Sequence, residues 1–520
     1  MSNPTATRDH AAEDPAFRAD TLADSVVLLL VWTVAQRLIG FCRAILFCRW
    51  LDPAVLGQWD MALGFLMLAA PVSVLALSSS FGRYVEYYRR RRQLRTLLVR
   101  TAVATGLLAC ASVTVIASAP RWFSRLIFGT PDEIGLVWLL AGSLLAVVAY
   151  HYFVNLLNAL RNVRLISAMQ VVNSLAFAGL GILLVWSWRA TAASAIVAFG
   201  AASAISAAFG LGWLVRRWEL LPGDGPPPPH RELWSKLVPF AASVWLASLL
   251  ANLFELADRY MIVHYLPGTA EQALAQAGNY HTSRVLPLLL VSVASLLSPV
   301  ITPHLTHDWE QGRRDRVSMR LNLYLKLLCT AMSVGAVAIL LAAPLLFDIV
   351  FQGKFSGGLA VLPGTLTYCV WFGTSMVAQN YLWCAEKARL GSLALLAGLS
   401  VNVGLSLLLL PSLGLKGAPI AAGAAHLVAL VLILGFSRRL GFRSDPGTWI
   451  VLSVPVVFWL GPWATMAVLI AIVFEAISTN RILTAEEKGH LLQAWLRYRQ
   501  RFLTTAAWWR SSSRGRAPGK

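Results

Sequence analysis

Two arginines inside the first long apolar segment are the residues of this chain best placed to do chemistry. Arg37 and Arg43 lie six positions apart in the run from Val26 to Cys48. An arginine near the middle of a membrane-spanning helix costs about 2.5–3.5 kcal/mol on insertion scales, so it normally faces a water-filled cavity or a partner. Six residues turn a helix by about 600°, which leaves the two side chains about 120° apart. Both can therefore border one wide cavity, where they would bind an anion.

A second group of polar residues follows one face of a later apolar run. Its members are spaced i, i+4, i+7 and i+11, and they are Ser248, Asn252, Glu255 and Arg259, with Asp258 beside them. One interpretation is that Glu255 or Asp258 binds a coupling proton or cation while Arg259 helps to hold an anionic substrate. The other is that Glu255 and Arg259 pair with each other and offset part of the burial cost. Both stay open, because intramembrane carboxylates are functional by default but this one has a ready partner.

Three further charged residues fall in or near apolar runs. Arg284 begins an uninterrupted apolar stretch and is either a cavity residue or an interfacial anchor. Asp60 is the acidic candidate of the first half and lies near a helix end. Lys326 lies near the predicted cytoplasmic end of its helix, so we expect it to snorkel to the surface. The predicted substrate-binding residues are Arg37, Arg43, Arg259 and Arg284, and the predicted polar coupling residues are Asn252, Glu255, Asp258 and Asp60.

No metal, redox or nucleotide chemistry is indicated, and we expect neither a cofactor nor a catalytic residue. The six cysteines all fall in apolar runs without a C-x-x-C pair, so they are interpreted as small apolar residues. His304 and His307 beside Asp308 have ligand spacing but no convincing third ligand. A phosphate-binding Gly-Lys-Ser/Thr loop is absent, which argues against direct coupling to ATP.

The composition is that of a polytopic membrane protein. Hydrophobic residues make up 57% of the chain and charged residues only 13%. The formal net charge is +19, but most lysines and arginines fall in loops that the positive-inside rule assigns to the cytoplasm. We attribute the basic balance to topology and to contact with anionic phospholipids, and we exclude nucleic acid as a partner. We also expect no cleavable signal peptide.

Apolar runs of about 20 residues predict twelve helices that cross the membrane. The chain is therefore expected to be a multi-pass protein of the inner membrane, with both termini in the cytoplasm. The expected spans are 26–48, 57–80, 98–118, 134–157, 168–187, 191–214, 237–263, 275–303, 322–347, 358–382, 391–410 and 416–437.

Two shorter membrane helices are expected after the twelfth. The run 448–477 is interrupted by Gly461-Pro462, and a hairpin that turns there keeps the arginine-rich end of the chain in the cytoplasm. The prediction is therefore an all-α fold with 12 to 14 transmembrane helices. Beyond the hairpin, Thr484 and Glu487 have the spacing of a capping box that opens an amphipathic helix, which we expect to lie on the inner leaflet.

The two halves of the chain resemble copies of each other. Leu56-Gly57-Gln58-Trp59 in the first half corresponds to Ala277-Gly278-Asn279-Tyr280 in the second, and the turn 164–167 corresponds to 389–392. A proline-rich stretch, 222–229, separates the halves as a stiff spacer. Transporters with repeats of this kind bind the substrate between the two halves. They move the substrate across the membrane by rocking one half against the other. The expected parts are a tail 1–24, a six-helix bundle 25–215, a linker 216–236, a second six-helix bundle 237–438, a hairpin 439–480 and a basic tail 481–520.

These motifs resemble the multidrug/oligosaccharidyl-lipid/polysaccharide (MOP) exporter superfamily. The stretches 36–43, 49–53 and 56–59 look like its opening, and Asp258-Arg259 with Gly278-Asn279-Tyr280 looks like the seventh and eighth helices of its polysaccharide-exporter branch. The Pro-x-x-Gly-x-x-Gly turn within 409–417 is also similar to that branch. Together these stretches are spread over most of residues 25–437.

The resemblance implies a two-bundle protein, similar to multidrug (MATE) transporters, that flips an undecaprenyl-diphosphate-linked oligosaccharide across the membrane. In the related lipid II flippases paired arginines of the first helix contact the diphosphate, and Arg37 and Arg43 match that pattern. Those flippases carry further basic residues toward the end of the second helix, whereas this chain has none between Arg49 and Arg83. The resemblance also implies a monomer that works beside a polysaccharide polymerase. It leaves open the glycan, with O-antigen (lipopolysaccharide), capsule, exopolysaccharide and teichoic-type precursors all candidates. It also leaves open whether a proton, a sodium ion or the membrane potential alone drives transport.

Two other functions were weighed against a flippase. A multidrug or cation antiporter of the same superfamily would line its cavity with carboxylates or aromatic residues, whereas the first half here carries arginines. A membrane glycan polymerase or glycosyltransferase would need a large external loop, and the longest one expected, near 119–131, is short. We therefore expect a transporter and not an enzyme.

Overall fold

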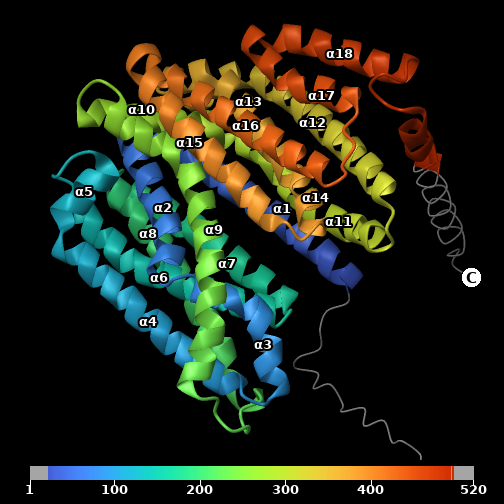
Figure 1. Ribbon diagram of the computed structural model, residues 1–520. Helices are drawn as coiled ribbons and strands as arrows, with labels where there is room; N and C mark the ends of the chain where they lie inside the picture. Colours follow the sequence, from blue (N-terminus) through green and yellow to red (C-terminus); the bar gives the residue numbers. More distant parts are fainter. Residues whose placement is uncertain (1–21, 494, 497–520) are drawn as a thin grey trace, which may run out of the picture. The chain divides into compact units, whose positions relative to one another are not determined.

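The computed structural model of the protein describes residues 22–493 and 495–496, and these residues form helices joined by short turns, with no β-strand among them (Figure 1). The all-α prediction is therefore confirmed. Most of the predicted tails, 1–24 and 481–520, lies outside the described residues. The α-helices are α1 (Leu22–Trp50), α2 (Pro53–Ser73), α3 (Phe81–Arg90), α4 (Leu94–Ser118), α5 (Pro120–Phe128), α6 (Ile134–Ala159), α7 (Val163–Ser187), α8 (Ala192–Arg216), α9 (His230–Tyr265), α10 (Ala270–Val285), α11 (Pro287–Glu310), α12 (Arg314–Leu345), α13 (Ser356–Ala378), α14 (Asn380–Cys384), α15 (Ala388–Leu413), α16 (Gly417–Arg439), α17 (Pro446–Ser453) and α18 (Pro462–Ser478).

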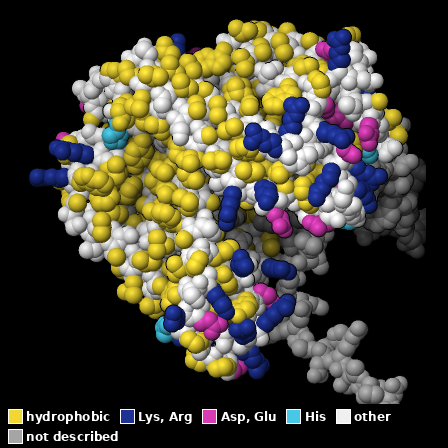
Figure 2. All heavy atoms as spheres, in the orientation of Figure 1, with side chains coloured by type: hydrophobic (Ala, Val, Ile, Leu, Met, Phe, Trp, Pro, Cys, Tyr) yellow, Lys and Arg dark blue, Asp and Glu magenta, His cyan; other side chains and the backbone are white. Residues whose placement is uncertain are grey.

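Each predicted span coincides with one or two of these helices. By length and apolar composition, 10 helical stretches within the described residues can cross a membrane, one of them a 52-residue stretch that contains both α15 and α16. Two shorter apolar stretches follow, Pro446–Leu460 and Pro462–Ser478. The protein is thus a polytopic membrane protein, and Figure 2 shows the wide hydrophobic areas on its visible face that such a protein turns toward lipid.

Three predicted spans are interrupted where the prediction had one helix; one of them, 358–382, is divided between α13 and α14 at Gln379. The span 57–80 ends as α2 at Ser73, and the chain then passes Leu75 and Ala76 in left-handed conformation, with φ of 50° and 48°. The span 275–303 is divided into α10 and α11, with Leu286 between them. Pro287 has no backbone N–H to continue the hydrogen-bond ladder of α10, so the break falls at that residue.

The contacts divide the chain into two compact units, which are described separately. The first unit comprises the chain up to Leu289 with 342–365 and 395–425, and the second comprises 290–341, 366–394 and the chain from His426 onward. The first unit therefore draws helices from both sequence halves. The predicted division into two six-helix bundles at the linker stays a prediction.

Helices α2 and α10 of the first unit cross at a pair of glycines. A Cβ on Gly57 would lie 1.9 Å from the carbonyl oxygen of Leu274, and a Cβ on Gly278 would lie 2.0 Å from that of Pro53. Only glycine allows two backbones to approach this closely, as in other membrane helix pairs. The two corresponding motifs of the sequence halves thus pack against each other, and this crossing fixes the residues one turn further along both helices.

The proline-rich linker is bound to the first unit along its length. Gly225 N donates to the carbonyl oxygen of Arg92 at 2.9 Å, and the side chains of Arg95 and Arg100 donate to the carbonyl oxygens of Leu221 and Pro228 at 2.8 and 2.6 Å. Figure 2 shows lysine and arginine side chains gathered at the lower end of the view, where Figure 1 places α3 and the start of α9. The linker therefore packs over the turn between α3 and α4 and is held there by hydrogen bonds.

In the second unit the C-terminal hairpin is present and turns where predicted. Helix α17 continues as a 3-10 helix, Val454–Leu460, and the chain reverses at Gly461, whose φ is 95°. The side chains of Cys329, Thr367 and Trp371 donate hydrogen bonds to the carbonyl oxygens of Val451, Pro455 and Leu452. These bonds attach the hairpin to α12 and α13.

The expectation that Lys326 snorkels to the surface is wrong. Its side chain is 2% exposed, and its ammonium is held by the carboxylates of Asp445 and Glu487. A buried lysine with two acidic partners has no need to reach water.

Candidate functional site

Asp60 on α2 is the centre of a buried polar network in the first unit. The residue is 1% exposed. Its Oδ1 lies 2.7 Å from Nδ1 of His281 on α10 and 3.3 Å from Nη1 of Arg259 on α9. One turn along α2, a Cβ on Gly64 would lie 3.2 Å from Nη1 of Arg259, so the glycine leaves room for the guanidinium. Three helices therefore converge on one carboxylate.

Glu255 lies at the more accessible side of this network. Its carboxylate is 3.8 Å from Arg259 and 3.7 Å from Arg284, and its side chain is 59% exposed while both arginines are nearly buried. The predicted pair between Glu255 and Arg259 forms, but Arg259 is shared with Asp60. Arg284 is a buried member of the network and not an interfacial anchor.

Asp258 is the third carboxylate, and it is held by neutral donors. The hydroxyl of Tyr280 on α10 donates to its Oδ2 at 2.8 Å, and Nδ2 of Asn402 on α15 donates to its Oδ1 at 2.7 Å. Ser406, one turn along α15, donates in turn to the amide oxygen of Asn402. Each oxygen of Asp258 thus has a donor, which stabilises a carboxylate away from water.

We call this set the polar network; its members are Asp60, Glu255, Asp258, Arg259, His281 and Arg284. Three carboxylates face two guanidiniums, so the network carries one uncompensated negative charge when His281 is neutral. In addition, Asp60 Oδ2 is buried and has no hydrogen-bond partner among the residues described here. When all three carboxylates are ionised, the network can therefore accept one further positive charge, and the excess negative charge is not fully buried because the Glu255 side chain is 59% exposed.

Five of the eight predicted site residues meet in the polar network, and three do not. Asn252 is directed at its own helix, where Nδ2 donates to the carbonyl oxygen of Ser248 at 2.8 Å. The sequence analysis missed His281, and the internal repeat could have found it. Asp60 and His281 are 221 positions apart, the same offset that relates Gly57 to Gly278.

Arg37 and Arg43, the other two, lie on α1 apart from the polar network. The guanidinium carbon of Arg43 is 3.8 Å from the ring centroid of Phe177 on α7, and that ring packs in an aromatic cluster with Phe47, Trp59 and Phe199. Arg37 is exposed. Within the described part of the chain, neither arginine forms an ion pair. A stacked arginine keeps its N–H groups available, and such groups bind phosphate oxygens well.

Comparisons with known proteins identify the family. The model of the family described as polysaccharide biosynthesis protein matches residues 22–307, which is more than half of the chain. None of the curated proteins matches it in sequence.

Solved structures show the same fold. The inward-closed lipid II flippase MurJ matches with a TM-score of 0.69 at 12% identity, over 87% of this chain and 98% of that protein. An inward-facing multidrug resistance MATE family transporter of the MOP superfamily matches with a TM-score of 0.58 at 14% identity, over 80% and 98%. A MOP superfamily transporter from Pyrococcus furiosus, described as having a binding pocket of reverse polarity, matches with a TM-score of 0.59 at 15% identity, over 80% and 95%.

The sequence motifs, the helical membrane architecture and the family match agree with one another. This chain belongs to the polysaccharide biosynthesis protein family, and it has the fold of the solved lipid II flippase and of MATE transporters of the MOP superfamily.

Proposed function

We propose that this transporter is a flippase that moves an undecaprenyl-diphosphate-linked oligosaccharide from the cytoplasmic to the outer leaflet of the inner membrane by alternating access. The observation that carries the proposal is the contrast between two sets of arginines. Arg259 and Arg284 are buried against carboxylates, whereas Arg37 and Arg43 have no acidic partner among the described residues. We therefore assign the diphosphate to Arg37 and Arg43. The sequence pattern predicted that Arg259 and Arg284 also bind the substrate, and we assign them a coupling role instead.

The charge of the substrate gives the direction of transport. A diphosphate with about two negative charges gains roughly 2.3 kcal/mol per charge per 100 mV when it moves outward across an inside-negative membrane. In the inward-open state Arg37 and Arg43 hold the head group, the glycan occupies hydrated space and the prenyl chain stays in lipid. Release on the outer side then resets the carrier.

The test of the substrate assignment is native mass spectrometry of the gently solubilised protein. Wild type is expected to carry a polyprenyl-diphosphate glycan, which the double variant Arg37→Ala/Arg43→Ala loses, because the two guanidiniums supply its charge-assisted hydrogen bonds. Arg49→Ala is the matched control, since Arg49 is an exposed arginine in the last turn of the same helix. Retention of the glycan lipid by the double variant would refute the assignment.

The polar network is proposed to couple transport to a cation, and His281 makes a proton the best candidate. Protonation of His281 against Asp60 would balance three carboxylates with three cations. Accordingly, His281→Gln is expected to leave flipping driven by membrane potential in place and to remove its acceleration by a proton gradient. Proteoliposomes that contain the glycan lipid, with potential and pH gradient imposed separately, measure both. A sodium gradient that accelerates wild type and His281→Gln equally would show that the coupling ion is sodium and that His281 is not its site.

A multidrug or cation antiporter remains the alternative, and the excess of carboxylates in the polar network is the observation that favours it. In that case wild type would bind lipophilic cations, carry only bulk phospholipid after purification, and lose cation binding on Glu255→Gln. The same mass spectra distinguish the two functions.

A further inference from the structure

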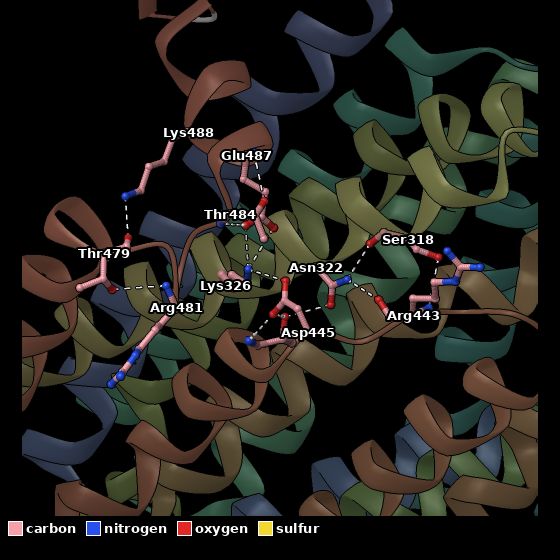
Figure 3. Close-up of polar contacts among 11 residues, drawn as sticks. Ser318, Asn322, Lys326, Arg443, Asp445, Thr479, Arg481, Thr484, Glu487 and Lys488 are labelled. Atoms are coloured by element: carbon pink, nitrogen blue, oxygen red, sulfur yellow. Dashed lines mark hydrogen bonds and ion pairs between the residues drawn. The ribbon is translucent and has the colours of Figure 1, made fainter.

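Lys326 on α12 is a buried cation of the second unit that the transport cycle above does not use. Its Nζ lies 2.6 Å from Oδ2 of Asp445 and 3.0 and 2.8 Å from the two carboxylate oxygens of Glu487 (Figure 3). Lys326 and Glu487 are 2% and 1% exposed. Without these two acids the ammonium would be a buried charge with no compensation, which is costly.

Both acids also begin a helix. Asp445 is the N-cap of α17, where its Oδ1 accepts from the backbone N of Thr448 at 2.7 Å. Glu487 belongs to a capping box, in which Thr484 N donates to Glu487 Oε2 at 2.8 Å and Glu487 N donates to Thr484 Oγ1 at 3.3 Å. That capping box was predicted from the sequence and opens the last described helix, which runs from residue 485 to 493. Two helix starts, distant from α12 in sequence, thus converge on one ammonium.

The surrounding polar contacts align the same three segments. Asn322, one turn before Lys326, donates to the carbonyl oxygen of Arg443 at 2.7 Å and accepts from the hydroxyl of Thr448 at 2.9 Å. Lys488, next to Glu487, donates to the carbonyl oxygens of Ile477 and Thr479 at the end of α18. Figure 3 shows how these residues surround Lys326, from α12, from the start of α17 and from the segment after α18.

We propose that Lys326 is a docking site for the C-terminal segment of this same chain, and that residues 479–493 act as a clasp that fixes the start of α17 on α12. Asp445 alone balances the charge of Lys326, but Glu487 is itself a buried carboxylate, and Lys326 is the cation that it pairs with among the described residues. A buried carboxylate without a cation is costly, so the segment that carries Glu487 docks where Lys326 lies. That this amphipathic helix lies on the inner leaflet stays a prediction; its Leu492 and Trp495 side chains are exposed. The inference concerns this chain's architecture and does not depend on the transported substrate.

Hydrogen exchange of the purified full-length protein, read by mass spectrometry, tests the clasp. In Lys326→Met, which leaves the buried Glu487 without its cation, amide exchange within 484–493 and 445–453 is expected to accelerate by about 100-fold or more, which is the equilibrium factor for removing one partner of a buried ion pair. Exchange in α4 and α6 of the first unit is expected to stay at the wild-type rate. Asp315→Asn is the matched control, because it removes the acid of a pair between Asp315 and Arg443 whose side chains are 83% and 82% exposed, and it should leave every segment unchanged.

The double variant Lys326→Met/Glu487→Met keeps the test decisive if a single variant does not fold. The double variant has no fully buried charge left at this site, because the remaining acid, Asp445, is 22% exposed. This protein is therefore expected to recover expression and the protection of 445–453 that Lys326→Met alone loses. Unchanged exchange in Lys326→Met would overturn the proposal. So would a double variant as poorly protected as the sum of the single ones, because that result would show that the two side chains do not act on each other.

Discussion

Replacing Asp60 with alanine is expected to abolish transport and to lower the stability of the protein by about 3–5 kcal/mol, the usual cost of removing one partner from a buried ion pair. The substitution leaves Arg259 without its nearer partner and His281 without an acceptor. Thermal unfolding in detergent measures the stability, and flipping in proteoliposomes measures transport. Asp60→Asn keeps the shape and the hydrogen-bond acceptor but not the charge, so it should recover only part of the stability and no response to a proton gradient.

The same helix offers a matched control for this experiment. Asp52 precedes α2 and pairs with Lys354 at 3.4 Å, with its side chain 76% exposed. Exposed ion pairs contribute about 0–1 kcal/mol to stability. The free energy of unfolding of Asp52→Ala should therefore lie within that range of the wild-type value. If Asp60→Ala unfolds like Asp52→Ala and still transports, the polar network is neither a structural nor a coupling element.

Replacing Gly57 or Gly278 with valine is expected to prevent accumulation of folded protein. The obstacle on each side is a backbone carbonyl oxygen, 1.9 Å from the new Cβ at Gly57 and 2.0 Å from it at Gly278, and a carbonyl in a helix cannot move aside as a flexible side chain can. Overpacking against side chains costs about 1–3 kcal/mol, and the cost here is larger because α2 and α10 must separate, which also breaks the contact between Asp60 and His281. Yield and monodispersity in size-exclusion chromatography are the measurements.

Gly106 on α4 provides the comparison, because nothing lies within 4 Å of the position that a Cβ would take there. Gly106→Ala should be neutral or stabilising by up to about 1 kcal/mol, the difference in helix propensity. Gly57→Ala adds the smallest possible side chain, and its melting temperature should already be clearly lower than that of Gly106→Ala. Equal melting temperatures for the two alanine variants would mean that the close crossing of α2 and α10 does not exist in the protein.

Hydropathy predicted the helices well because a membrane span needs only length and apolar composition. It could not place the interruption at Leu75-Ala76, which depends on the left-handed conformation of two residues other than glycine. The interruption at Leu286 could have been placed from Pro287, which lacks the N–H that would continue the helix. The turn at Gly461 was predictable, since a Gly-Pro pair both permits a positive φ and removes an N–H.

Charge pairs within one helix were predictable and pairs between distant segments were not. Glu255 and Arg259 are four residues apart, so their contact follows from helical geometry. The partners of Lys326 are 119 and 161 positions away, and no local pattern connects them. Asp60 and His281 are also far apart in sequence, but the internal repeat relates them. The alignment of the two halves that pairs Gly57 with Gly278 also pairs Asp60 with His281, so this contact could have been predicted from it.

The crossing of α2 and α10 shows what joining the two halves in one polypeptide makes possible. Three pairs have one offset: Pro53 and Leu274, Gly57 and Gly278, and Asp60 and His281. The second and third pairs meet at this crossing, and the carbonyl oxygens of Pro53 and Leu274 each face the glycine of the other helix. In a symmetric dimer of identical halves, a residue at such a position would face its own copy. Two aspartates would repel there and two histidines could not share a proton with an acid. An acid can face a base at such a position only when the two copies differ, and fusion into one chain allows them to differ.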